Sequence, residues 1–229
     1  MHMHMQSVLN SLKLFHPTFV VLKTIRKGAR ICLGSILGAV FEEKLRFYRD
    51  WDARDFQAPS PHFIKQRVVL RNGIKGSTYI ETGTHLGLTT ELLALQASRV
   101  FTLEPSFTLY EKAKLRLSKF ENVECLHGSS EELLPILIPK IRGAVTFWLD
   151  GHYMGGDTYK GIDETPILKE LEIIALNLEK FSRVTLLIDD IRLFENESLS
   201  YPHRDFLVKW ALSNNFWWNI EHDIFIAKK

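Results

Sequence analysis

The chain has 229 residues, of which 45% are hydrophobic and 24% charged, and its formal net charge is +2. This length and composition are ordinary for a globular protein with one α/β domain, a sizeable core and an extra N-terminal element. A charge so close to neutral makes no case for a nucleic-acid partner, and we expect none. No apolar run approaches the roughly 20 residues of a membrane span. Cys32 and Cys125 lie far apart in the sequence, which favours reduced thiols and a cytoplasmic location.

An amphipathic segment precedes the main domain. The opening residues MHMHMQ are treated as a terminus without a fold of its own. Residues 7–48 alternate apolar clusters with basic residues, and within them residues 24–41 predict an amphipathic helix with a basic side. We favour a helix that caps the main domain or a second copy in a homodimer; the alternative is a peripheral contact with a membrane surface. The glycines of this segment are expected to weaken any long helix; they are Gly28, Gly34 and Gly38.

Two prolines within residues 55–62 predict a linker. We therefore expect an N-terminal helical extension and linker at 1–62 and the main domain at 63–229. Helices of the main domain are predicted at 63–72, 90–98, 107–120, 131–138, 165–181 and 204–213. Strands are predicted at 78–80, 100–103, 123–126, 145–149 and 184–188, and residues 215–229 predict two more strands joined by a tight turn. This alternation predicts an α/β domain with a mostly parallel sheet flanked by helices.

The most informative stretch is 78–90, TYIETGTHLGLTT. A strand ends at Glu81 and turns through Gly83 and Gly87 into a helix, which offers backbone groups to a small ligand at the edge of the sheet. Glycine loops of this kind are common, so the carboxylate is the stronger signal. A phosphate cradle avoids a negative charge at that position, whereas a cationic amine or sulfonium is attracted to it. His85 stands where a dinucleotide-binding fold usually has glycine. The stretch therefore favours S-adenosylmethionine over a dinucleotide.

The pattern Glu-x-Gly-x-x-x-Gly-x-Thr resembles the first motif of class I methyltransferases. It is most similar to the form found in metal-dependent O-methyltransferases of the catechol and caffeoyl-CoA type, and the resemblance extends from about residue 78 to the C-terminus. It implies a Rossmann-like fold with seven strands, in which the C-terminal hairpin places an antiparallel strand in the sheet. The function it implies is S-adenosylmethionine-dependent methyl transfer (EC 2.1.1 class), with oxygen of a small hydroxylated metabolite or sugar as the acceptor.

Several loop residues are candidates for binding the cofactor. Glu104 ends the second strand, about 20 residues after the glycine loop, where a carboxylate can accept hydrogen bonds from both ribose hydroxyls. The resemblance assigns Glu104 the same role. Ser129 follows the third strand, and the resemblance places it beside the adenine; Ser129 or Ser130 could equally cap the next helix. The remaining candidates for contact with the cofactor are Glu81, Gly83, Thr84, Gly87, Pro105 and Asp150.

Three carboxylates end two neighbouring strands: Asp150 after the fourth, and Asp189 and Asp190 after the fifth. They would repel one another in an empty site, and a hard divalent cation would remove that repulsion. The resemblance implies that all three bind Mg²⁺. In the alternative without metal, Asp150 holds the methionine ammonium of the cofactor or a substrate donor, while one of the pair caps a loop.

The chain departs from the resembled family just after Asp150. The family has a lysine three residues after this aspartate, and here that position is Tyr153. We predict that His152 is the catalytic base, assisted by Asp150. Lys160 is an alternative base, and a plain surface position for His152 is equally compatible with the sequence. The glycine-rich loop 152–161 is predicted to close over the acceptor.

Two other functions compete with methyl transfer. One is a non-catalytic nucleotide-binding or scaffold protein with the same fold. The other is an NAD(P)-dependent oxidoreductase, which His85 and the absence of Gly-x-Gly-x-x-Gly spacing disfavour.

Overall fold

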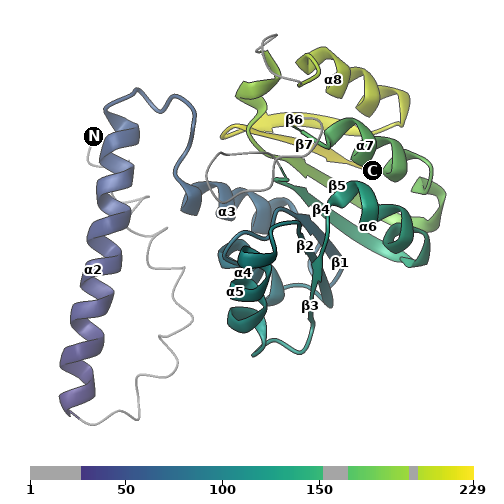
Figure 1. The fold of residues 1–229 in the computed structure, drawn as a ribbon. Helices are drawn as coiled ribbons and strands as arrows, with labels where there is room; N and C mark the ends of the chain where they lie inside the picture. The colour runs from purple at the N-terminus through teal and green to yellow at the C-terminus, as the bar shows by residue number, and fades with distance from the viewer. Residues whose placement is uncertain (1–26, 152–164, 196–200) are drawn as a thin grey trace. The chain divides into compact units, whose positions relative to one another are not determined.

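The computed structural model of the protein describes residues 27–151, 165–195 and 201–229; for residues 27–37 it describes the backbone alone. The chain divides into two compact units, Met1–Gln57 and Ala58–Lys229. The predicted boundary between residues 62 and 63 lies near this division. Figure 1 draws both units.

The described part of the first unit contains one long helix, α2 (Lys27–Asp52). Its end lies eleven residues beyond the predicted end (52 against 41), so the expected weakening by glycine does not interrupt it. Aromatic packing holds its C-terminal end: the rings of Trp51 and Phe56 are 5.0 Å apart in a T-shaped arrangement. The Trp51 indole N–H also donates to the carbonyl of Gln57 at 3.0 Å. Among the described helices, none combines the length and the apolar character needed to cross a bilayer.

The second unit is built on one twisted sheet, in which the described residues form seven strands in the order β3-β2-β1-β4-β5-β7-β6 (Figure 1). The strands β1 to β5 are parallel, and β7 is antiparallel to both β5 and β6. The strands are β1 (Thr78–Thr82), β2 (Arg99–Glu104), β3 (Val123–His127), β4 (Gly143–Leu149), β5 (Phe181–Ile188), β6 (Trp217–Glu221) and β7 (Ile224–Lys228). This order, with its antiparallel hairpin, is that of the Rossmann-like class I methyltransferase fold, and the predicted fold class is confirmed.

Helices cover both faces of this sheet because neighbouring residues of a strand point to opposite sides. Ile80 packs in a core with α6, α7 and α8, whereas Tyr79 packs in a second core with α3 and α4. The helices are α3 (His62–Asn72), α4 (Leu88–Ala94), α5 (Phe107–Leu117), α6 (Ser130–Leu137), α7 (Ile167–Ala175) and α8 (Arg204–Ser213). Short runs of apolar residues therefore bury both of their faces, as parallel strands require.

The predicted helix at residues 165–181 is much shorter than expected. Residues 165–181 were predicted as a single helix, but α7 ends at Ala175 and a short 3₁₀ turn follows at Leu178–Lys180. The side-chain amide of Asn177 donates to the carbonyl of Ile173 at 2.8 Å, and Asn177 has a non-helical backbone with φ −124°. Asparagine side chains compete in this way with the backbone hydrogen bonds of a helix. The spacing of the apolar residues alone does not indicate this end of the helix.

We expect residues 58–229 to fold without the first unit. The two hydrophobic cores consist of residues between Val68 and Ala227, so the described first unit contributes none of them. A truncated chain starting at Ala58 should give a cooperative thermal transition and the far-UV circular dichroism of an α/β protein. A lower Tm or a changed oligomeric state would support the capping interpretation of the N-terminal helix. Loss of liposome sedimentation alone would support the membrane interpretation, and an unfolded truncated chain would contradict the prediction.

Candidate cofactor and acceptor site

The loop after β1 is held against the end of β4. Gly83 has φ +86°, and a Cβ added to it would lie 2.5 Å from the carbonyl oxygen of Asp150. The Asp150 N–H donates to the carbonyl of Thr82 at 3.1 Å. His85 also has a left-handed backbone, with φ +51°, which histidine adopts more readily than most side chains. The loop therefore makes its turn without a glycine at this position.

Glu104 joins the tip of β2 to this loop. Its side chain is 4% exposed. The backbone N–H of His85 donates to Oε2 at 2.7 Å, and the N–H of Ser106 donates to Oε1 at 2.9 Å. Burial raises the pKa of Glu104, and the two backbone hydrogen bonds oppose this shift. The predicted ribose-binding carboxylate is thus fixed in position beside the glycine loop.

Glu81 lies inside the protein, 1% exposed. The hydroxyls of Thr90 and Thr102 donate to its Oε2 at 2.5 and 2.6 Å. The Thr84 hydroxyl is 2.6 Å from that of Thr102, so these two hydroxyls share a hydrogen bond. Burial raises the pKa of Glu81 to about 7, against the effect of the threonine hydrogen bonds. Glu81 and Thr84 therefore belong to a buried hydrogen-bond network that supports the loop after β1. Their direct contact with a cofactor stays a prediction.

Ser129 follows β3, and His127 at the end of this strand lies beside two aromatic rings of α5. Ser129 is the N-cap of α6, and its N–H donates to the Glu132 side chain at 3.3 Å in a capping box. The capping interpretation is therefore the one the structure displays, and contact with adenine stays a prediction. His127 pairs in register with Glu104, and its ring lies 5.4 Å from Phe107 and 5.2 Å from that of Tyr110. This aromatic group was not predicted, although Phe107 and Tyr110 have helical spacing.

Asp150 reaches the same edge from β4. Its side chain is half-buried. Burial and the nearby carboxylates of Asp189 and Asp190 raise its pKa well above its ordinary value. The predicted base His152 and the alternative Lys160 lie outside the described residues, as does the predicted lid, so the structure does not place a base beside Asp150.

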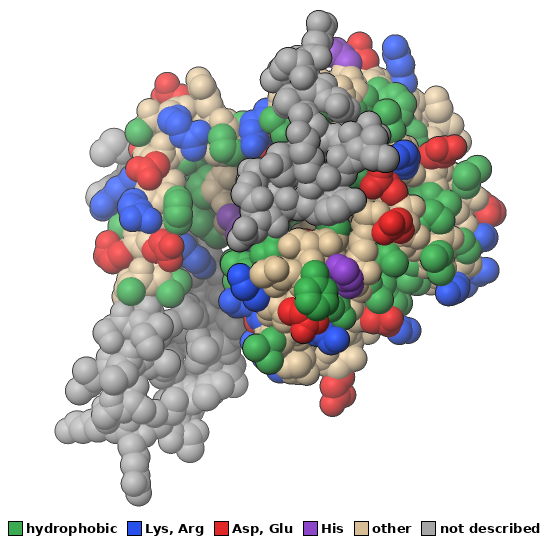
Figure 2. All heavy atoms as spheres, viewed as in Figure 1, with side chains coloured by type: hydrophobic (Ala, Val, Ile, Leu, Met, Phe, Trp, Pro, Cys, Tyr) green, Lys and Arg blue, Asp and Glu red, His purple; other side chains and the backbone are tan. Residues whose placement is uncertain are grey.

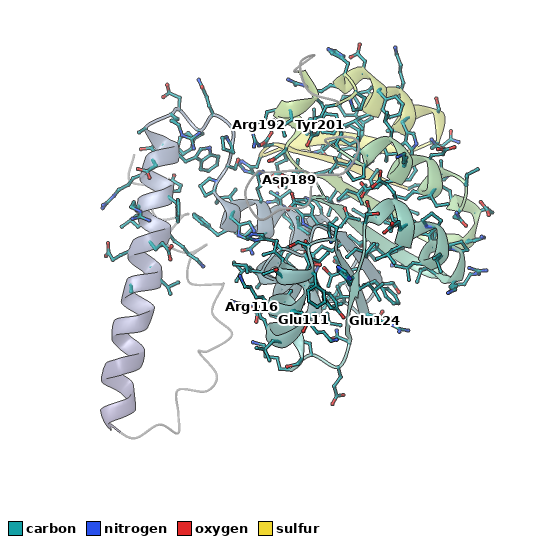
Figure 3. All side chains as sticks on the ribbon, in the orientation of Figure 1. Glu111, Arg116, Glu124, Asp189, Arg192 and Tyr201 are labelled. Atoms are coloured by element: carbon teal, nitrogen blue, oxygen red, sulfur yellow. The ribbon has the colours of Figure 1, made fainter. Side chains whose placement is uncertain are left out.

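The carboxylates after β5 meet a lysine. Lys65, on α3, is 7% exposed, and its Nζ lies 2.7 Å from Oδ1 of Asp189. It also forms an ion pair with Asp190 and lies 3.6 Å from Oδ2 of Asp223. The guanidinium of Arg192 pairs with Asp190 and with Asp223. Figure 3 labels Asp189 and Arg192 at this edge of the sheet.

The charges of these ionisable groups shift one another's pKa values. Burial lowers the pKa of Lys65, but Asp189 and Asp190 raise it by more, so the net shift is upward. Burial raises the pKa of Asp189 to about 6, and Asp190 adds to this shift while Lys65 opposes it. The pKa values of Lys65 and Asp189 are therefore both raised. Three carboxylates surround the one ammonium group of Lys65, so its charge cannot fully offset the burial of each carboxylate.

The predicted magnesium site does not fit these residues. Oδ1 of Asp189 accepts from Lys65 and from the N–H of Asp190, at 2.7 and 2.8 Å, and Oδ1 of Asp190 accepts from Lys65 and Arg192. Within the described ranges, no group of three His, Cys, Asp or Glu side chains is arranged to hold a metal ion. Sequence reasoning missed Lys65, which is 125 residues from Asp190. In the sequence, Arg192, two residues after Asp190, was the one indication that a cationic side chain would lie beside these aspartates.

No protein-family model and no curated protein matches the chain. Among solved structures, an rRNA methylase from Streptococcus thermophilus is 17% identical, with 75% of this chain and 96% of that chain covered and a TM-score of 0.44. A Streptococcus mutans protein described as a methyltransferase, in complex with SAH, is 15% identical, with 75% and 98% covered and a TM-score of 0.49. TrmK from M. capricolum, in complex with S-adenosylhomocysteine, is 15% identical, with 72% and 66% covered and a TM-score of 0.44.

These similarities are too low to carry an argument about activity, and the fold assignment rests on the strand order. The narrower resemblance to O-methyltransferases of the catechol and caffeoyl-CoA type is not confirmed by them. One prediction needs correction. The absence of a nucleic-acid partner was expected from net charge, yet a protein of similar structure is an rRNA methylase. Net charge is a sum over the whole molecule; acidic and basic side chains are interspersed on the face drawn in Figure 2, and their sum cannot exclude a local contact with RNA.

Proposed function

We propose that this protein is an enzyme that transfers a methyl group from S-adenosylmethionine to an oxygen of a small hydroxylated metabolite or sugar. The observation that carries this proposal is the Glu104 carboxylate, which is buried at the tip of β2 and hydrogen-bonded to the N–H of His85 in the glycine loop. This pair lies at the carboxyl ends of β1 and β2, and open α/β sheets bind ligands at the carboxyl ends of their strands, which supports the proposal. The choice of oxygen as acceptor rests on the motif resemblance.

Glu104, the glycine loop and Asp150 each have a role in this proposal. Glu104 accepts hydrogen bonds from the ribose hydroxyls, and the loop from Gly83 to Gly87 lies against the methionine portion. Asp150 anchors the cofactor ammonium or a substrate donor, and a cationic ligand would favour its ionised form. When bound, the cofactor supplies a methyl group on a positively charged sulfur. The protein then has to align the acceptor oxygen with that methyl group and exclude water.

Glu104→Gln should weaken the binding of S-adenosylhomocysteine by roughly 10- to 100-fold, because charge-assisted hydrogen bonds contribute about 1.5–3 kcal/mol. Isothermal titration calorimetry on both proteins measures this change. Glu124→Gln is the matched control: Glu124 lies on the neighbouring strand β3, where it pairs with Arg99 at the surface, and it should leave the affinity unchanged. A circular dichroism melt checks that Glu104→Gln still folds.

A wild-type protein that does not bind S-adenosylhomocysteine at high micromolar concentration would overturn the proposed function. Binding of NAD(P) instead would support the oxidoreductase. The acceptor is then sought by transfer of a radiolabelled methyl group to hydroxylated metabolites, sugars and RNA. Binding without transfer to any acceptor would favour the non-catalytic alternative.

A further inference from the structure

The edge of the sheet that carries Asp189 and Asp190 has a positive charge supplied by the chain itself. Lys65 reaches it from α3, the helix that precedes β1. We propose that the Lys65 ammonium takes the place of a divalent cation here, so that the carboxylates are held together without a metal ion. This inference deepens the proposed function, on which its catalytic consequence rests.

The distances suit an ammonium ion. A lysine has three N–H donors, and the Lys65 Nζ lies within ion-pair distance of three carboxylates: Asp189, Asp190 and Asp223. The 2.7 Å between Nζ and Asp189 is typical of a charge-assisted N–H···O bond. Mg²⁺ would require its oxygens at about 2.0–2.1 Å in octahedral geometry. The distances between the carboxylates and the Lys65 Nζ are therefore those of an ammonium ion and not those of Mg²⁺.

A second cation and the backbone fix this arrangement from the other side. Arg192 bridges Asp190 and Asp223. The N–H of Arg192 donates to Oδ1 of Asp223 at 2.9 Å, and the N–H of Ile191 donates to the Asp223 carbonyl at 3.0 Å. Asp223 belongs to the turn between β6 and β7, so the C-terminal hairpin and the end of β5 are tied to the same cluster.

A metal ion that took Oδ1 of Asp189 and Oδ1 of Asp190 as ligands would displace Lys65. That would leave an ammonium ion that is 7% exposed without its partners, and an unpaired buried charge is strongly unfavourable. The proposed methyl transfer would therefore proceed without metal, and the acceptor would be oriented by protein groups instead of by chelation. A substrate with a single hydroxyl would serve as well as one with two adjacent hydroxyls.

The first test is binding of Mn²⁺ to the full-length wild type and to Asp189→Asn, followed by electron paramagnetic resonance at constant ionic strength. We expect the same Mn²⁺ occupancy in both proteins up to millimolar concentration, because Asp189 is paired with Lys65. Mn²⁺ binding to the wild type that Asp189→Asn abolishes would overturn the proposal. This readout does not depend on methyl transfer, so it is independent of failure of the proposed function.

The second test removes the lysine. Lys65→Met should lower Tm by roughly 10 °C, since breaking a buried ion pair is costly, and Mn²⁺ should recover part of that loss. The double variant Lys65→Met/Asp189→Asn should show no such recovery. Lys169→Met is the control: Lys169 pairs with Glu131 at the surface, with a side chain 54% exposed, and its loss should change Tm little and create no response to Mn²⁺. A Lys65→Met protein with unchanged Tm, or one without a Mn²⁺ response, would overturn the proposal. If Lys65→Met does not fold, the wild-type titration decides.

Discussion

Gly83→Ala is expected to destabilise the protein by roughly 3–5 kcal/mol. Two costs combine. The backbone of Gly83 is in the left-handed region, with φ +86°, and the new Cβ would lie 2.5 Å from the carbonyl oxygen of Asp150. That oxygen belongs to the backbone at the end of β4 and cannot rotate away. Either the loop or the strand end must shift, so urea unfolding should report a large loss of unfolding free energy.

Gly143→Ala separates the two costs. Gly143 has a similar backbone, with φ +82°, but a Cβ added there would meet no atom within 4 Å. Its substitution should cost about 1–2 kcal/mol, the cost of the backbone conformation alone. The difference between the two variants measures the contact of the glycine loop with β4. Equal losses in both would show that this contact is looser than the structure describes.

The second large effect is a pH dependence caused by Glu81. Its pKa in the folded protein is raised from the ordinary value of 4.5 to about 7. In that interval the folded protein retains a proton that the unfolded chain has released, so raising the pH destabilises the folded state. The shift corresponds to roughly 3 kcal/mol of stability that is present below pH 4.5 and lost as the pH rises through 7.

Glu81→Gln isolates this contribution. The glutamine oxygen can still accept hydrogen bonds from Thr90 and Thr102, but it does not titrate. Urea unfolding of both proteins at intervals from pH 4.5 to pH 8 gives the difference in stability, in which the titration of other shared groups largely cancels. We expect the wild type to lose stability relative to the variant as the pH rises. Parallel curves would mean that Glu81 is ionised in the folded protein throughout this range.

Local patterns in the sequence were sufficient for the architecture. The β-branched run that ends at Glu81 is strand β1, and the predicted helix 204–213 coincides with α8. The C-terminal pair of strands was predicted from residues 215–229 and forms the antiparallel hairpin. Such elements are determined by the period of apolar residues and by turn residues close to them in the chain. The alternation of strands and helices then restricts the topology of the sheet.

Tertiary structure decided the charge of the site. Three aspartates at strand ends predicted a metal ion because their charges would repel one another in an empty site, yet Lys65 reaches Asp189 and Asp190 from α3. That contact depends on the packing of α3 against the sheet, and α3 (His62–Asn72) lies more than 100 residues before Asp189 in the chain. For the same reason the sequence could place Glu81 at a strand end but could not reveal its burial beneath Thr90 and Thr102. Residue spacing determines which groups reach an edge of a sheet, whereas the partners and pKa values of those groups depend on contacts between residues distant in the chain.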